Sequence, residues 1–155
     1  MQIYFLRHAD ADTPAESDDA RALSEKGIEQ ARKVGKFLAG GGIKPMLILS
    51  SPVRRAHETA SLVSEEIGVE VRLAPWLACG LRPPAGLEEI SALRQHAAVL
   101  LVGHEPDFSR LISHLLGLPT PTAFHVRKAS LTLIEIDIFK PGAARLEFFI
   151  PCKLM

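Results

Sequence analysis

Residues 99–102, Val-Leu-Leu-Val, form an uninterrupted apolar run that is followed directly by Gly103 and His104. A short run that is apolar at every position is typical of a strand buried on both faces, as in a parallel sheet covered by helices. Similar short runs alternate along the chain with segments of helical periodicity, which is typical of α/β proteins. We therefore predict one domain over residues 1–155, a three-layer α/β/α fold with a mostly parallel sheet of about six strands.

The expected strands are short runs rich in β-branched residues or leucine: Gln2–Leu6, Met46–Leu49, Val69–Leu73, Val99–Val102, Leu131–Ile136 and Arg145–Ile150. The last two are close in sequence and joined through Lys140-Pro141-Gly142, so we expect an antiparallel hairpin at the edge of the sheet. The expected helices are bounded by capping residues, proline and glycine: Ser24 to Leu38, Ser51-Pro52 to Gly68, Leu87 to His96, and Pro106 to Gly117.

Composition excludes several classes of partner. The 18 basic and 18 acidic residues balance, so the chain has no overall field that would attract nucleic acid or anionic lipid. Its apolar runs are too short for a signal peptide or a membrane span, and we expect a cytoplasmic protein. Cys79 and Cys152 are too few for a disulfide framework, and we expect both to be reduced and buried. The oligomeric state is left open by the sequence.

Histidines and arginines follow three of the expected strands. The carboxyl ends of parallel strands meet at one edge of a sheet, where ligands bind. Strand ends deliver the following residues there: Arg7 and His8, Ser50-Ser51-Pro52 with Arg54 and Arg55 just beyond, and Gly103-His104-Glu105. Arginine pairs with phosphate oxygens through two parallel hydrogen bonds, and the amino end of the helix after Ser51 adds free N–H groups. The expected ligand is a phosphate or phosphoryl group.

His8 is the best candidate for a nucleophile at this edge. A histidine attacks phosphorus only when one ring nitrogen is unprotonated, and neighbouring guanidinium groups favour that neutral form. Arg7, Arg55 and His104 would stabilise the charge on the phosphoryl oxygens. For His104 alone, a structural role after a buried strand is an equal alternative. Arg54 is expected at the surface.

Four segments in order resemble the histidine phosphatase superfamily, and within it the small bacterial phosphohistidine phosphatases of the SixA type. The segments are Leu6-Arg7-His8-Ala9, the run from Arg21 through Leu23, Ser24, Gly27, Gln30, Ala31 and Gly35 to Leu38, the run Ser50 to Ala60, and Val102-Gly103-His104-Glu105-Pro106. The resemblance implies a phosphatase with a covalent phosphohistidine intermediate on His8 and with no metal or cofactor. It implies catalytic roles for Arg7, Arg55 and His104.

Arg21, Ser51 and Glu105 are expected to bind substrate. A solvated salt bridge with Asp18 or Asp19 is an alternative for Arg21, and Glu105 is equally interpreted as a solvated loop charge or a proton donor. The remaining histidines, His57, His96, His114 and His125, have no partner at metal-ligand spacing and are expected to be structural.

The chain departs from the family pattern at two places. Position 9 is alanine where the family has glycine, which is harmless if the local φ is negative. Residues 77–80, Leu-Ala-Cys-Gly, contain no carboxylate where relatives acting on phosphate monoesters often carry their acid. This absence favours a substrate with a good leaving group.

The expected rims of the site, Ala78–Gly86 and Thr120–Phe124, are short, and an open site suits a phosphorylated side chain of another protein, above all phosphohistidine. Two other functions stay open. The first is a metal-dependent phosphohydrolase, against which the arginines argue by repelling cations. The second is a receiver-like phosphoacceptor module with Asp10 or Asp12 as acceptor. The candidate metal ligands are His8, Asp10, Asp12, His104 and Asp107.

Overall fold

One six-stranded sheet forms the centre of the protein. The computed structural model describes residues 1–13, 17–120 and 124–155. The strands are β1 (Gln2–Arg7), β2 (Leu47–Ser50), β3 (Val71–Leu73), β4 (Ala98–Gly103), β5 (Leu131–Ile136) and β6 (Ala144–Ile150). They lie in the order β3-β2-β4-β1-β5-β6. Pairing is parallel from β3 to β1 and antiparallel for β1–β5 and β5–β6, so the predicted mostly parallel sheet and its hairpin are confirmed.

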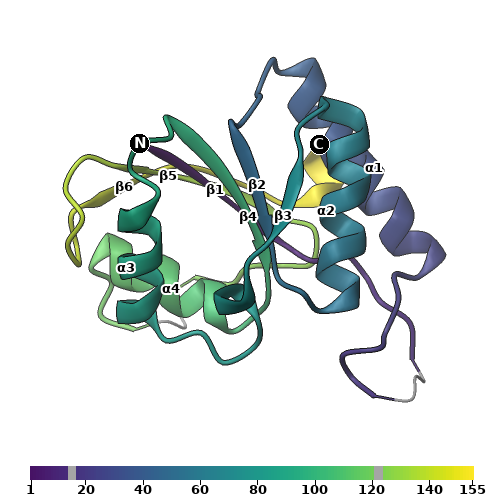
Figure 1. Ribbon diagram of the computed structural model, residues 1–155, viewed down its shortest axis with the longest axis horizontal. Helices are drawn as coiled ribbons and strands as arrows, with labels where there is room; N and C mark the ends of the chain where they lie inside the picture. Colours follow the sequence, from purple (N-terminus) through teal and green to yellow (C-terminus); the bar gives the residue numbers. More distant parts are fainter. Residues whose placement is uncertain (14–16, 121–123) are drawn as a thin grey trace.

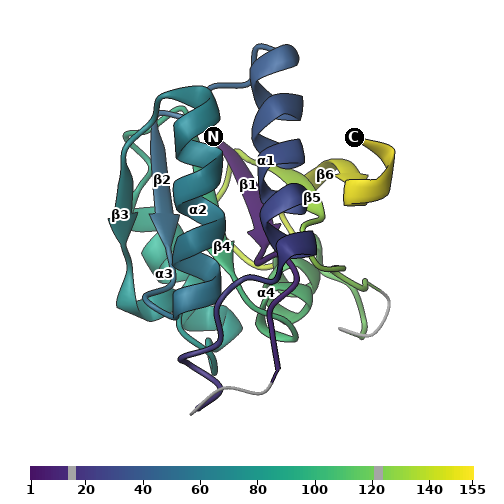
Figure 2. The ribbon, with the colours of Figure 1, turned by 90° about the vertical axis from the view of Figure 1, so that its right-hand side faces the viewer.

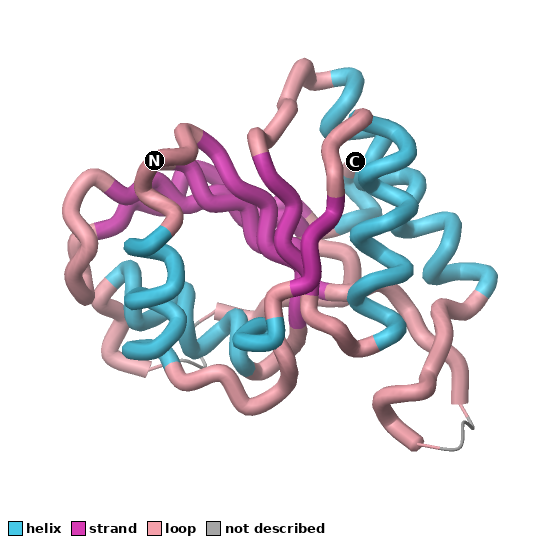
Figure 3. The backbone as a smooth tube through the Cα atoms, viewed as in Figure 1, coloured by secondary structure: helices cyan, strands magenta, loops and turns pink. Residues whose placement is uncertain are grey.

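Helices cover both faces of the sheet (Figures 1 and 3). On one face lie α1 (Glu25–Gly40) and α2 (Arg54–Ile67), and on the other α3 (Pro83–Ala92) and α4 (Asp107–Leu116). Alternate residues of β1 serve the two layers, because successive side chains of a strand point to opposite faces. Tyr4 and Leu6 pack into the cluster with α1 and α2, whereas Ile3 and Phe5 pack into the cluster with α3 and α4. The predicted three-layer α/β/α architecture is confirmed.

The helix boundaries follow from local chemistry. The Ser24 hydroxyl accepts a hydrogen bond from the Gly27 N–H at 3.0 Å and so caps α1 where the sequence predicted it. Both α2 and α4 end at a glycine in the left-handed region, Gly68 with φ of 65° and Gly117 with φ of 69°. Glycine adopts this conformation without a steric penalty, which is why these predicted ends are correct.

Two predicted helix starts are wrong. The second helix begins at Arg54 and not at Pro52, because the Ser51 hydroxyl bonds the Val53 N–H at 3.2 Å and holds residues 51–53 in a bend. The third helix begins at Pro83 and ends at Ala92, about one turn earlier than expected. Proline fixes φ near the helical value and lacks the N–H that a first turn leaves unpaired, so the Pro83-Pro84 pair starts the helix.

Cys79 is exposed, contrary to our expectation, whereas Cys152 is buried as expected. Cys79 lies in a turn at the carboxyl edge of the sheet, before Gly80, whose φ is 97°. The turn is held by the Gly80 N–H, which donates to the Asp107 carboxylate at 2.7 Å. No helix among residues 1–13, 17–120 and 124–155 is long and apolar enough to cross a bilayer.

Candidate active site

Adjacent strand ends bring the predicted site residues together. In the sheet β1 neighbours β4, with Arg7 opposite Gly103, and β4 neighbours β2, with Val102 opposite Ser50. Two further backbone hydrogen bonds continue this pairing beyond the strands. The His8 N–H donates to the Gly103 carbonyl and the Ser51 N–H to the Val102 carbonyl, both at 2.9 Å. The register of three parallel strands therefore places His8, Ser51 and His104 side by side.

Gly103 has a packing role at this edge. A Cβ atom on Gly103 would lie 2.7 Å from the ring of Phe108, which is closer than carbon atoms normally approach. The missing side chain lets α4 pack directly against the end of β4, and His104 follows at once.

One ring nitrogen of His8 is available for nucleophilic attack. Its Nδ1 lies 2.7 Å from the carbonyl oxygen of Ala9, which only accepts hydrogen bonds, so Nδ1 carries the proton. The other nitrogen, Nε2, then holds a lone pair, and the Arg55 Nε–H donates to it at 3.3 Å. Both contacts select the same tautomer. The unprotonated Nε2 therefore faces the guanidinium group of Arg55.

The surroundings of His8 keep the ring neutral. The residue is 7% exposed, and burial lowers its pKa from 6.5 to about 3, with further lowering by the charges of His104, Arg55 and Arg7. A neutral ring is the nucleophilic form. Burial and cationic neighbours together keep the His8 ring neutral through the physiological pH range.

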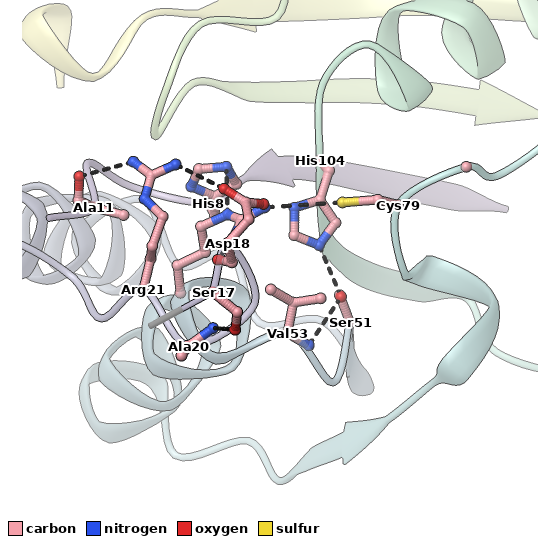
Figure 4. A network of polar contacts seen from close by, with 12 residues as sticks. His8, Ala11, Ser17, Asp18, Ala20, Arg21, Ser51, Val53, Cys79 and His104 are labelled. Atoms are coloured by element: carbon pink, nitrogen blue, oxygen red, sulfur yellow. Dashed lines mark hydrogen bonds and ion pairs between the residues drawn. The ribbon is translucent and has the colours of Figure 1, made fainter. Parts of the chain in front are cut away.

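His104 lies next to His8, with the ring centroids 5.3 Å apart. Its Nε2 is 2.8 Å from the Ser51 hydroxyl, which already accepts from the Val53 N–H and so has its proton free for His104 (Figure 4). In that arrangement Nδ1 carries the ring proton, and this buried atom has no partner among the described residues. Burial lowers the pKa of His104 to about 4. The lowered pKa keeps the ring of His104 neutral, and with the ring proton on Nδ1 it carries an N–H donor beside His8.

Arg55 is the central cation of the site. It is 5% exposed, and its nitrogen atoms contact His8, Asp18 and, at 3.8 Å, the Cys79 sulfur. Arg54, by contrast, lies at the surface with Glu58 at 2.7 Å, as expected.

Arg7 completes the positive side of the site. Its Nη1 donates to the Val126 carbonyl at 2.9 Å, while its buried Nε has no partner within the described part of the chain. Burial lowers the pKa of Arg7, while the charge of Glu105 raises it and the charge of Arg55 lowers it. The Val126 contact fixes the direction of the guanidinium.

Asp18 is the residue of this site that sequence reasoning missed. Its carboxylate accepts from Arg55 Nη2 at 3.0 Å and from Arg21 Nη1 at 3.0 Å, and its backbone carbonyl accepts from Arg55 Nη1 at 2.7 Å (Figure 4). The hydrogen bond from Arg21 and the charge of Arg55 lower its pKa. The acidic pair Asp18-Asp19 was visible in the sequence, but only as a partner for Arg21. In the fold, Asp18 contacts both terminal nitrogens of Arg55.

The three residues expected to bind substrate have other contacts in the structure. Each side-chain nitrogen of Arg21 donates a hydrogen bond. Nε donates to the Asp12 carbonyl, Nη2 to the Ala11 carbonyl and Nη1 to the Asp18 carboxylate. Arg21 thereby holds the loop after β1. Glu105 accepts from the hydroxyl and N–H of Ser109 and so caps the first turn of α4. Ser51 orients His104.

The loop residue Ala9 is compatible with the site. It is fully buried, and its φ is not positive, because Ala129 is the only non-glycine residue with positive φ in the described ranges. The Ala9 N–H donates to the Thr59 hydroxyl at 3.1 Å, and that hydroxyl donates to the Arg55 carbonyl at 2.7 Å. Thr59 thus ties the loop of His8 to the helix of Arg55.

The carboxylates proposed for a metal site are used elsewhere. Asp10 pairs with Lys128 at 2.5 Å and accepts from Ser24 at 2.8 Å, and Asp107 accepts from Gly80. No group of three or more potential ligands is placed to hold a metal ion within residues 1–13, 17–120 and 124–155. Of the expected rims, residues 78–86 lie beside the site, but residues 121–123 of the second rim are outside the described residues.

Comparisons with known proteins agree with this geometry. The model of the histidine phosphatase superfamily (branch 1) matches residues 3–78. Phosphohistidine phosphatase SixA of Escherichia coli (strain K12) is 31% identical over 144 residues, which cover 87% of this chain and 87% of that protein. The chain belongs to the histidine phosphatase superfamily and is a phosphatase.

Two solved structures show the same fold. The protein histidine phosphatase SixA complexed with tungstate has a TM-score of 0.90 at 24% identity, covering 99% of this chain and 98% of that one. Alpha-ribazole phosphatase from Shigella flexneri has a TM-score of 0.82 at 20% identity, covering 98% and 97%. Since enzymes named for different substrates share this fold, the choice of substrate must come from the site.

Proposed function

We propose that this phosphatase hydrolyses phosphohistidine on proteins through a covalent phosphoryl intermediate on Nε2 of His8. The observation that carries the proposal is the state of His8: Nδ1 bonds the Ala9 carbonyl at 2.7 Å, and the lone pair of Nε2 faces Arg55 at 3.3 Å. This is the atom that a phosphoryl acceptor requires, in the neutral form and beside cations that stabilise the transferred group.

The first step moves the phosphoryl group to the enzyme. Nε2 of His8 attacks phosphorus, the new N–P bond forms as the bond to the leaving group breaks, and the bonding electrons depart with the leaving group. Arg7, Arg55 and the Nδ1–H of His104 donate hydrogen bonds to the phosphoryl oxygens. In the second step water attacks phosphorus, the bond between phosphorus and Nε2 breaks, and its electron pair returns to the ring of His8. The attacking water loses one proton to the phosphate oxygens or to solvent, and phosphate leaves as neutral His8 is restored.

The leaving group decides the substrate class. An alkoxide leaving from a serine or sugar phosphate needs a proton from a positioned acid, worth about 100-fold to 10,000-fold in rate. Asp18 is a carboxylate in contact with Arg55, yet Arg21 and Arg55 lower its pKa and so favour its unprotonated form. A phosphorylated imidazole takes up its proton from solvent and leaves as neutral imidazole, so it tolerates a site without an acid. These facts favour phosphohistidine.

The test is a comparison of phosphohistidine, phosphoserine and a sugar phosphate at equal concentration. We expect phosphohistidine to react at least about 100-fold faster, because the proposed site has no acid to protonate the alkoxide that leaves from the other two substrates. Equal rates on phosphohistidine and phosphoserine would show that an acid is present and would refute the proposed substrate.

The intermediate has its own test. His8→Ala is expected to fold but to lose turnover and labelling by phosphate, whereas His57→Ala, a change at a histidine of α2 outside the site, should retain both. The labelled wild type should be acid-labile and base-stable. An acid-stable label would point to an acyl phosphate, as a receiver-like module would form on aspartate, and activity lost on chelation would favour the metal-dependent alternative.

We also propose a cytoplasmic location and a role in phosphohistidine signalling, which rest on the sequence-based expectation and on the proposed substrate. Cell fractionation tests the first of these.

A further inference from the structure

A groove of about 510 Å³ opens directly beside the phosphate site. It begins at Arg7, whose guanidinium belongs to the site, and it is bordered by the start of α1, the segment before β5 and the C-terminal turn. Its lining is Arg7, Asp10, Lys26, Gln30, His125, Arg127, Lys128, Pro151, Cys152 and Lys153. Arg7 therefore belongs both to this groove and to the proposed site of phosphoryl transfer.

The groove is strongly basic in a chain whose charges otherwise balance. Of the described residues that line it, five are arginine or lysine and one, Asp10, carries a carboxylate, although the whole chain has 18 basic and 18 acidic residues. Asp10 is already neutralised by Lys128 at 2.5 Å. Among the residues that the structure describes, Lys26, Arg127 and Lys153 have no acidic partner within 4.0 Å, and all three are exposed. Their charges are free to act on a ligand.

A second hollow, of about 260 Å³, extends the groove along α1. It shares Lys26, Gln30, Cys152 and Lys153 with the first and adds Lys33 and Glu29. The Cys152 sulfur contacts the Gln30 carbonyl at 3.8 Å, so the C-terminal turn lies beside α1 (Figure 2). The basic lining thus continues away from His8 as an elongated strip.

We propose that this groove binds an acidic segment of the phosphoprotein substrate while its phosphohistidine enters the site. The inference rests on the proposed function and extends it by naming the chemistry of the partner. An elongated strip of unpaired cations matches an extended chain with Asp and Glu side chains. None of the described residues in the lining is Phe, Tyr or Trp, on which the bases of a nucleic acid would stack. A peptide segment is the occupant that this lining favours.

The experiment uses two synthetic phosphohistidine peptides with the same central residues, one flanked by Asp and Glu and the other by Asn and Gln. We expect kcat/KM of the wild type to be about tenfold higher for the acidic peptide at low salt, since a partly exposed ion pair contributes a factor of about 1.4 to 5 and three unpaired cations are available. The preference should shrink as salt is raised, because the screening length falls to on the order of 10 Å at 0.1 M.

A triple variant tests the groove against a matched control. Lys26→Glu/Arg127→Glu/Lys153→Glu should reduce the ratio between the two peptides to about one or below. The control, Lys44→Glu/Arg94→Glu/Lys140→Glu, makes the same change of charge at exposed residues near the opposite edge of the sheet, and should keep the wild-type ratio.

The possible failures are distinguishable. If both peptides are hydrolysed at equal rates by the wild type, or if the groove variant keeps the wild-type ratio, the groove proposal is wrong while the proposed function stands. If neither peptide is hydrolysed but p-nitrophenyl phosphate is, the proposed function itself is wrong. Stronger inhibition by a short RNA, or by phosphatidylglycerol vesicles, than by an unphosphorylated acidic peptide of equal charge would overturn the choice of a peptide as the occupant.

Discussion

The Asp18→Asn variant tests whether Asp18 competes with phosphate for Arg55. The carboxylate accepts from Arg55 Nη2 at 3.0 Å, and the side chain of Asp18 is 64% exposed. An exposed ion pair is worth about 0.2 to 1 kcal/mol. In the proposed reaction an incoming phosphoryl group binds the same nitrogen, so we expect it to displace this contact. Asparagine keeps the size of the side chain and an acceptor oxygen, and removes only the charge.

The expected result is tighter binding of oxyanions. Loss of up to about 1 kcal/mol of competition corresponds to an inhibition constant for inorganic phosphate that is up to about fivefold lower. The assay measures competitive inhibition by phosphate in the wild type, in Asp18→Asn and in Asp19→Asn. Asp19 is the matched control, since it has the same charge and lies in the same loop, but makes no hydrogen bond or ion pair with Arg55 among the described contacts.

Two results would refute this reasoning. An inhibition constant that is unchanged or higher in Asp18→Asn would show that the carboxylate does not compete with phosphate. A loss of kcat beyond about 100-fold would show that Asp18 is a proton donor in the reaction, against the lowered pKa of its carboxyl group.

Three further predictions follow from the histidines and from Glu105. Burial lowers the pKa of His8 from 6.5 to about 3. Between these two pH values the ring binds a proton in the unfolded chain but not in the folded protein. The contribution of neutral His8 to the free energy of unfolding is therefore complete above pH 6.5 and is lost as the pH falls towards 3. The free energy of unfolding, measured with urea at several pH values below 6.5, should therefore change with pH more steeply in the wild type than in His8→Asn, by up to about 1.4 kcal/mol per pH unit. Equal slopes in the two proteins would mean that the folded protein does not hold the ring neutral. Ser51→Ala should lower kcat/KM on phosphohistidine by about tenfold, because the Ser51 hydroxyl would no longer hold His104 in one tautomer. An unchanged kcat/KM would contradict this role of Ser51. Glu105→Gln should lower kcat only modestly, because Glu105 bonds Ser109; a loss beyond about 100-fold would identify Glu105 as an acid.

Much of the fold was predictable because its signals are local. The apolar run at Val99–Val102, the cap at Ser24 and the glycines at 68 and 117 each specify one element through backbone geometry or burial. The two helix starts that failed depend on details of the local turns that the sequence pattern does not specify: Ser51 bonds the Val53 N–H, so α2 begins later, and the Pro83-Pro84 pair starts α3 earlier.

The sequence by itself determined the sheet, the layers and the placement of Arg7, His8, Arg55 and His104 near one edge, because the ends of neighbouring parallel strands must converge. Only the tertiary structure decided which atoms meet. It selected the tautomer of His8 through Ala9 O, placed Asp18 on Arg55, and left Cys79 exposed beside it. The physical reason is that a hydrogen bond forms only when its two atoms lie about 3 Å apart. Whether two side chains come that close depends on the conformation of the loops that carry them, which no local sequence pattern specifies.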